Sequence, residues 1–212
     1  GGILTGGAVY TSHANFKIGD QLYTMRPSLF GANKVMPRSF NNDNSKLSVT
    51  FYEMDGVEVR QELIPRENIA KKAGAVLIKY VFKNNSGTTK RVGAVLKLDT
   101  YIGGIDNITG NDSARLSTPI GIIRNQQEIK PVPDYWLAFE NIQDTSALIG
   151  RGTLRGKDLV FPEFLFVGNY EQLTTYKYDE PILSGGPYYD SEILMRWKEV
   201  LLQPGESTYF ST

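Results

Sequence analysis

The strongest constraint in this sequence is an alternation of apolar and polar residues on both sides of a single Asp-Gly step. Residues two positions apart on a strand share one face, so this alternation is typical of half-buried β-strands. Asp55-Gly56 interrupts it, and Asp-Gly provides the positive φ angles that a two-residue hairpin turn requires. We therefore predict strands over 47–54 and 57–64, with Pro65 ending the second.

A second hairpin and several further strands follow from the same logic. Apolar runs over 76–83 and 91–100 flank an Asn-Asn-Ser-Gly cluster at 84–87, and these residue types favour turns. The run at 76–83 is apolar on both faces, which is typical of a central strand in a packed sandwich. A Pro-Gly turn at 203–206 precedes the last predicted strand. The other predicted strands cover 135–139, 148–154, 159–167, 192–200 and 207–211.

These strands predict an all-β fold, a large antiparallel two-sheet β-sandwich with very little helix. The 21 glycines and 12 tyrosines fit strands and turns better than helices. Residues 66–73 offer at most a turn or two of helix before Gly74. No linker interrupts the rhythm of strands and turns, so we expect one domain over 1–212. In it, 1–46 forms irregular strands and loops and 47–212 forms the main sandwich.

Composition removes several classes of chemistry and of partner. The chain has no cysteine, which excludes a disulfide framework, a thiol nucleophile, a Cys-ligated zinc and an iron–sulfur cluster. Its 23 basic and 23 acidic residues balance without a dense patch of either sign, so we expect no nucleic-acid partner. The longest apolar run, around 75–78, is far shorter than the ~20 residues of a bilayer span, and no transmembrane segment is expected.

Candidate catalytic groups are few. His13 is the only imidazole, so a mechanism that needs two histidines is excluded. It lies in a Gly-rich stretch, and no nucleophile elbow occurs anywhere in the chain, which favours an exposed polar residue over a catalytic one. Glu163 would have a raised pKa if it pointed into the interior, but the neighbouring Pro162 favours a strand edge with the carboxylate in solvent. No catalytic residue is therefore assigned.

An oxygen-rich segment begins at the end of the strand over 91–100. Asp99, Asp106, Asn107 and Asp112 supply carboxylate and amide oxygens among several glycines. Calcium takes about six to eight oxygen ligands from flexible loops, so this segment is where we predict a calcium ion, the one cofactor that the sequence suggests. Asx and Gly residues also build ordinary surface turns, and a purely structural loop is the alternative.

Aromatic residues are the last pool of candidate binding groups. Planar rings exposed on a sandwich face stack on sugar rings, so a carbohydrate-binding surface is one hypothesis. Trp136 and Trp197 lie inside alternating strands, where burial in the core is the expectation. Tyr188 and Tyr189 follow Gly-Gly-Pro and are expected to be exposed. The tyrosines that we predict for a ligand-binding surface are Tyr176, Tyr178, Tyr188 and Tyr189.

Seven short motifs follow one another along the chain in a characteristic order. They are DGVEVRQEL at 55–63, IKYVFKNNS at 78–86, VGAVLKLDTYIGG at 92–104, VPDYW at 132–136, GTL at 152–154, DSEILMRW at 190–197 and LQPGES at 202–207. In this order and spacing the chain resembles an uncharacterised β-sandwich domain of large bacterial secreted and cell-envelope proteins. The resemblance implies a galactose-mutarotase-like supersandwich and a secreted or cell-surface location in bacteria. It supplies no catalytic residues, because a mutarotase-type site needs more than one imidazole.

Two functions are consistent with these observations. The first is a non-catalytic β-sandwich module of an exported bacterial surface protein, serving adhesion, assembly or carbohydrate binding, with a glycan or a protein as partner. The second is a carbohydrate-active enzyme, a hydrolase or epimerase on a mutarotase-like scaffold that uses carboxylates. A concave face with two convergent acids would favour the enzyme, and a filled face would favour the module.

Overall fold

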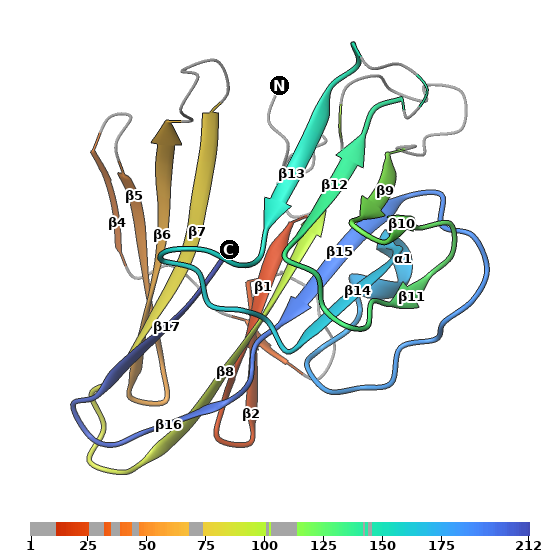
Figure 1. The fold of residues 1–212 in the computed structure, drawn as a ribbon. Coiled ribbons are helices and arrows are strands. Elements are labelled where there is room, and N and C mark those ends of the chain that lie inside the picture. The colour runs from red at the N-terminus through yellow and green to blue at the C-terminus, as the bar shows by residue number, and fades with distance from the viewer. Residues whose placement is uncertain are drawn as a thin grey trace.

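Strands form almost all of the regular structure of the chain (Figure 1). The computed structural model describes residues 12–25, 32–34, 39–43, 47–67, 74–100, 102, 114–141, 143 and 146–212. Within these residues the only helix is the single turn α1 (Tyr170–Leu173), and no helix is long and apolar enough to cross a membrane. The all-β class predicted from the alternation is therefore confirmed.

The strands are arranged in three sheets, antiparallel except where β2 pairs with β3. The large sheet has the order β11-β14-β15-β8-β1-β2-β3, with β16 also on β8; the five-stranded sheet has the order β17-β7-β6-β5-β4, and the four-stranded sheet β10-β9-β12-β13. The strands are β1 (His13–Ile18), β2 (Gln21–Thr24), β3 (Asn33–Lys34), β4 (Ser39–Asp43), β5 (Leu47–Met54), β6 (Val57–Glu67), β7 (Gly74–Asn84), β8 (Lys90–Asp99), β9 (Arg115–Thr118), β10 (Gly121–Ile122), β11 (Gln127–Glu128), β12 (Tyr135–Phe139), β13 (Ile149–Thr153), β14 (Phe164–Asn169), β15 (Ser191–Arg196), β16 (Val200–Leu202) and β17 (Ser207–Ser211).

The sandwich has two layers, and the second layer is made of two sheets. One contiguous core cluster joins Phe16 of the large sheet to Phe82 of the five-stranded sheet and to Trp136 of the four-stranded sheet. The two smaller sheets therefore pack on the same inner face of the large sheet. Figure 1 shows them side by side, with β7 and β13 as the facing edges.

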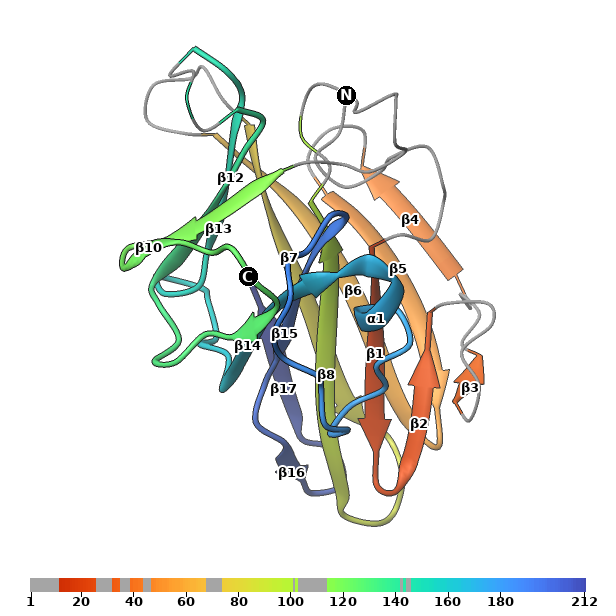
Figure 2. The same ribbon diagram turned by 90° about the vertical axis from the view of Figure 1, so that its right-hand side faces the viewer.

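The outer face of the large sheet has a cover of its own. Val95, Phe166 and Leu194 form a second apolar cluster together with Leu173 of α1 and Tyr178 of the segment that follows it. Figure 2 shows α1 and this segment lying across the sheet. We call residues 174–183 the strap. The strap buries side chains that would otherwise face solvent.

The hairpins and most strand predictions are confirmed. Asp55 and Gly56 have φ angles of 48° and 74°, the positive values that the predicted turn requires. β12 and β17 have the predicted bounds, and β7, β8 and β13 differ from the prediction by two residues or fewer at each end. Trp136 and Trp197 are buried as expected.

The prediction that Pro65 ends its strand is wrong, because β6 continues to Glu67. Ile78 exchanges two backbone hydrogen bonds with Thr212, so its neighbour Leu77 directs its backbone groups to Ile64 on β6. The nitrogen of Pro65 therefore points to the side of β6 away from β7. On that side β5 pairs with β6 only as far as Leu63, so among the described residues the missing N–H of Pro65 removes no hydrogen bond. The sequence offered at most a turn or two of helix over 66–73. Residues 66 and 67 belong to β6, and residues 68–73 lie outside the described residues.

Three further expectations need correction. The N-terminal region is not merely irregular, because β1 lies in the middle of the large sheet between β2 and β8. The strand predicted over 159–167 begins only at Phe164 in β14, and the one over 192–200 is split into β15 and β16 by Trp197, which turns its ring into the core. Strands β9, β10 and β11 were not predicted because each is only two to four residues long.

Candidate functional site

A cleft with a volume of about 540 Å³ lies where β7 and β13 face each other. This volume falls in the range of ligand-binding clefts. We call it the edge cleft. β7 and β13 run in the same direction along its two sides (Figure 1). Its lining includes Arg66, Gly74–Ile78, Leu98, Trp136, Ile149–Thr153, Lys157, Asp158, Leu159 and Thr212.

One side of the edge cleft is β7, whose edge beyond Ile78 has no strand partner among the described residues. β7 pairs with β6 over its whole length, but its pairing with β17 stops at Ile78, which exchanges bonds of 2.9 and 3.0 Å with Thr212. Backbone direction alternates along a strand, so Val76 and Gly74 direct their N–H and C=O groups to the same side as Ile78. In the described part of the chain that side is the edge cleft.

The opposite side is β13, whose outer edge has no strand partner in the described part of the chain. Leu154 donates its N–H to Asp134 at 2.8 Å, and Glu140 donates to Leu148 at 3.0 Å, so the even-numbered residues of β13 face β12. Ile149, Arg151 and Thr153 must then direct their backbone groups away from β12. Among the described strands β13 pairs with β12 alone, and these groups face the edge cleft.

The floor of the edge cleft is the margin of the apolar core. Ile78, Leu98 and Trp136 are each less than a tenth exposed and come from all three sheets. The indole of Trp136 lies against Gly152, where an added Cβ would be 2.2 Å from Nε1, so β13 needs glycine here. Within the described structure Trp136 Nε1 is a buried donor with no hydrogen-bond acceptor.

The rim of the edge cleft is basic. Arg66, Arg151 and Lys157 contribute cations to the lining, and Asp158 is the one acidic side chain among its described residues. Asp158 is paired with Arg66 at 3.4 Å. The guanidinium of Arg151 lies 4.2 Å from the ring centre of Tyr135 on the neighbouring strand β12. The rim therefore has surplus positive charge.

A row of buried ionisable side chains lies elsewhere, on the outer face of the large sheet. His13, Lys97, Asp99 and Glu192 are all less than a tenth exposed, and Lys97 stands opposite His13 in the register. Lys97 Nζ donates to the carbonyls of Tyr176 at 2.5 Å and Thr174 at 3.2 Å, and lies 3.2 Å from His13 Nε2. The expectation that His13 is exposed is therefore wrong, because the strap covers this end of β1.

The calcium prediction stays a prediction. Asp99 is at the end of β8 opposite Glu192, and Asp106, Asn107 and Asp112 lie outside the described residues. Within the described part of the chain, no group of three or more His, Cys, Asp or Glu side chains is placed to hold a metal ion.

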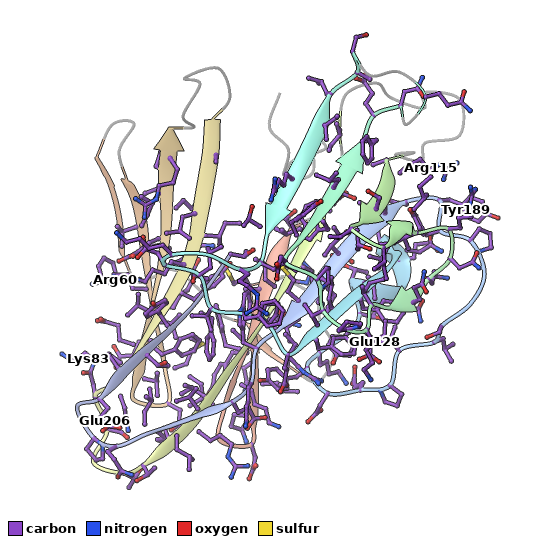
Figure 3. All side chains as sticks on the ribbon, viewed as in Figure 1. Arg60, Lys83, Arg115, Glu128, Tyr189 and Glu206 are labelled. Atoms are coloured by element: carbon purple, nitrogen blue, oxygen red, sulfur yellow. The ribbon has the colours of Figure 1, made fainter. Side chains whose placement is uncertain are left out.

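The tyrosines predicted for a ligand surface are mostly internal. Tyr176, Tyr178 and Tyr188 are at most 4 % exposed, whereas Tyr189 is 60 % exposed and lies at the edge of the molecule (Figure 3). The expectation of exposure is wrong for Tyr188, whose hydroxyl donates to the carbonyl of Ile123 at 2.8 Å and accepts the N–H of Leu116.

The two strap tyrosines also have internal partners. Tyr176 donates its hydroxyl to the carbonyl of Tyr178, and Tyr178 donates its own to the carbonyl of Trp197 at 3.2 Å. Burial raises the pKa of both hydroxyls, although the Arg196 guanidinium beside them acts in the opposite direction. These rings fasten the strap to the sheet, so their faces are not available for stacking on a sugar.

We expect this burial to make the fold sensitive to alkali. Burial raises the pKa of Tyr52 from 10.0 to about 12, and it raises the pKa of Tyr188 as well. The unfolded chain loses these protons near pH 10 while the folded chain keeps them, so stability is fully present below about pH 10 and falls as pH rises toward 12. Phenolate absorbance and far-ultraviolet circular dichroism should change together. A phenolate signal that develops while the strand signal persists would contradict burial of these hydroxyls.

Glu163 lies on the solvated surface, as the neighbouring proline indicates. It precedes β14 and is exposed, and its carboxylate pairs with Arg196 at 3.2 Å. The preference for a solvated carboxylate over a buried acid is confirmed.

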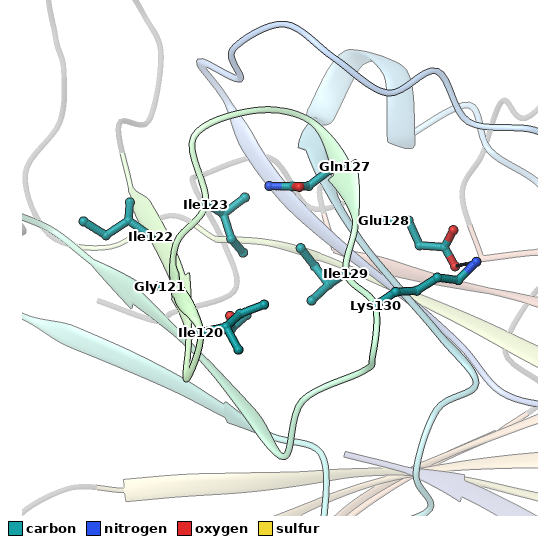
Figure 4. Close-up of a pocket in the computed structure, with 9 residues that line it drawn as sticks. Ile120, Gly121, Ile122, Ile123, Gln127, Glu128, Ile129 and Lys130 are labelled. Carbon is teal, nitrogen blue, oxygen red and sulfur yellow. Dashed lines mark ion pairs between the residues drawn. The ribbon is translucent and has the colours of Figure 1, made fainter.

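A second hollow, of about 160 Å³, lies within the loop that joins β9 to β11. Ile120, Ile123 and Ile129 line it, and Figure 4 shows Glu128 and Lys130 paired with each other on the loop. Their ion pair measures 2.9 Å. This hollow is small, and the one ion pair in its described lining joins two surface side chains, so it offers less room for a ligand than the edge cleft.

The sequence analysis missed the residues of the edge cleft. β13 was predicted as a strand, but the two glycines of its Ile-Gly-Arg-Gly-Thr sequence were not interpreted. Glycines at alternate strand positions indicate close approach of large side chains, and here Gly150 and Gly152 lie against Ile102 and Trp136. That signal places one face of β13 on the core, but nothing local shows that its edge is open.

No protein-family model matches the chain, and no curated protein matches it.

Proposed function

We propose that this chain is a non-catalytic assembly module that accepts an extended polypeptide strand from a protein partner in the edge cleft. A strand placed there would pair with the outward backbone groups of β7 and β13, the recognition mode known as β-augmentation. It would join the two smaller sheets into one continuous layer. The resemblance to bacterial envelope proteins supports assembly at a bacterial surface as the setting.

The end of β17 carries this proposal. Thr212 pairs through its backbone with Ile78 on β7, and its Oγ1 donates to the carbonyl of Thr153 on β13 at 3.2 Å. One residue therefore bonds to both edges at once, through its backbone to β7 and through its hydroxyl to β13. From Thr212 the edge cleft extends along β7 toward Gly74 and along β13 toward Ile149. We call this path between the two strand edges the lane.

The other candidate functions have less support. Stacking on sugars needs exposed rings, and three of the four candidate tyrosines are buried. A carboxylate-based hydrolase needs two convergent acids, whereas Asp158, paired with Arg66, is the one acidic side chain in the described lining of the edge cleft. Carbohydrate binding and the carbohydrate-active enzyme therefore remain weaker alternatives.

We expect short peptides of alternating valine and threonine to bind the protein through their backbones. Titration of a fluorescent peptide by anisotropy would measure this. N-methylation of alternate peptide amides keeps the side chains but removes donors, each worth about 0.5–1.5 kcal/mol. Methylating two amides on the paired side should weaken binding roughly tenfold. Equal binding of the methylated peptide would overturn strand pairing.

A matched pair of protein variants locates the effect. Val76→Pro removes an N–H that points into the edge cleft and leaves the bonds between β6 and β7 intact, so it should fold and lose most peptide affinity. Ala75→Pro removes an N–H that points to β6, so it should lower the free energy of unfolding instead. Unchanged peptide affinity in a folded Val76→Pro protein would count against the edge cleft as the site.

A further inference from the structure

The direction of the bound strand follows from the register of β17. This inference rests on the proposed function. β17 is antiparallel to β7, with Ser211 opposite Lys79 and Thr212 opposite Ile78. A strand in the same lane meets Leu77, Val76, Ala75 and Gly74 in turn. Since β7 and β13 run in the same direction (Figure 1), the strand is antiparallel to both.

The inner face of that lane is apolar. Ile78 is part of the core cluster, and side chains alternate along a strand, so Val76 lies on the inner side as well. Leu98 and Trp136 complete the floor. Every second side chain of the bound strand would be buried on this floor, and burial there favours residues such as valine and leucine.

The outer face of the lane is basic. Arg66 stands opposite Ala75 in the register, and Ala75 alternates with Val76, so both lie on the outer side. Arg151 alternates with Gly150 and Gly152, which lie against core side chains, and it too lies on the outer side. Lys157, in the loop after β13, is the third cation of the cleft lining, and Asp158 offsets one of the three.

We infer that the partner strand runs antiparallel to β7 and alternates apolar residues with acidic ones, the apolar side chains on the core and the carboxylates on Arg66, Arg151 and Lys157. Opposite charges across a rim raise selectivity more than affinity. The inference therefore concerns which strand is chosen, and strand pairing itself does not depend on it.

Three peptides of equal length, alternating valine with glutamate, threonine or lysine, test the charge pattern. Exposed ion pairs are worth about 0.2–1 kcal/mol each, so at low salt the glutamate peptide should bind roughly tenfold more tightly than the threonine peptide. The lysine peptide should bind least. The preference should shrink as salt is added.

Charge reversal on the protein locates the preference. The double variant Arg151→Glu, Lys157→Glu should reverse the order of the glutamate and lysine peptides. The control Arg115→Glu changes an exposed arginine on β9, which β12 separates from β13, and should leave the order unchanged.

The outcomes separate this inference from the proposed function. Equal affinities for the three peptides, with binding still lost on N-methylation, would overturn the charge pattern and leave strand binding standing. Absence of binding by all three peptides would overturn both. Sedimentation of the protein alone is the last measurement. If the protein forms a dimer and Val76→Pro disrupts it, the occupant is a second copy of this chain, and the inference of an acidic partner strand is overturned.

Discussion

Replacing Phe16 with alanine is expected to lower the free energy of unfolding by about 3–5 kcal/mol, the usual cost of truncating a buried aromatic ring. Phe16 is fully buried. Its ring centre lies 5.3 Å from that of Tyr80 and 5.6 Å from that of Phe82, both in edge-on arrangements. The substitution would leave a cavity where β1 meets the five-stranded sheet. Urea denaturation followed by circular dichroism measures the loss.

Phe161 provides the matched control. It is 37 % exposed and carries the Arg155 guanidinium 4.2 Å from its ring centre, a contact worth about 0.5–1 kcal/mol at an exposed site. Phe161→Ala should therefore cost about 1 kcal/mol or less. A loss of similar size in the Phe16→Ala protein would mean that β1 does not contribute a central part of the core.

The strand that contains Phe16 illustrates how much of the fold the sequence could predict. Ala14, Phe16 and Ile18 alternate with polar residues and are all fully buried, so the period-two signal of β1 was present. The run is short and we predict only irregular strands and loops over 1–46, whereas β5 and β6 flank an Asp-Gly turn that is recognisable in the sequence. Local patterns thus predicted hairpins well. They could not predict that β1 pairs with β8, about eighty residues away, in the centre of the large sheet.

The edge cleft was beyond sequence analysis for a different reason. Its parts are the start of β7, the whole of β13 and Thr212, and each is an ordinary strand segment. What makes them a site is that two strand edges, each without a partner among the described strands, face each other. That arrangement depends on how two sheets share one face of a third. Burial of Tyr176 and Tyr178 is equally non-local, because Gly93 on β8 makes room for the Tyr178 hydroxyl, where an added Cβ would be only 1.9 Å away.

Replacing Lys97 with methionine should also be strongly destabilising, by about 3–5 kcal/mol, because it removes two buried hydrogen bonds from a charged donor to the carbonyls of Thr174 and Tyr176, each worth about 1.5–3 kcal/mol. Methionine keeps most of the side-chain volume, so the loss reports the ammonium and not a cavity. An ammonium can only donate, so His13 Nε2 accepts, as do the carbonyls of Thr174 and Tyr176. Asp99 lies two residues along the same face.

We expect a large loss of stability because methionine cannot donate the hydrogen bonds that Lys97 gives to the strap carbonyls. The carbonyl of Tyr176 keeps one donor, Asn15 Nδ2 at 3.0 Å, but a buried carbonyl that loses its charged donor costs about 1–3 kcal/mol. Burying a thioether offsets only part of this, since the lysine methylenes are already buried.

Lys83→Met is the control that distinguishes loss of the buried ammonium group from loss of any lysine side chain. Lys83 is an exposed strand residue on β7, and its replacement should change the free energy of unfolding by about 0.5 kcal/mol or less. In Lys97→Met the strap should also exchange its amide hydrogens faster, because the ammonium ties two strap carbonyls to the sheet. If Lys97→Met is as stable as Lys83→Met and the strap stays protected, apolar packing of Tyr176 and Tyr178 is sufficient to hold the strap, and the buried charges add nothing to the fold.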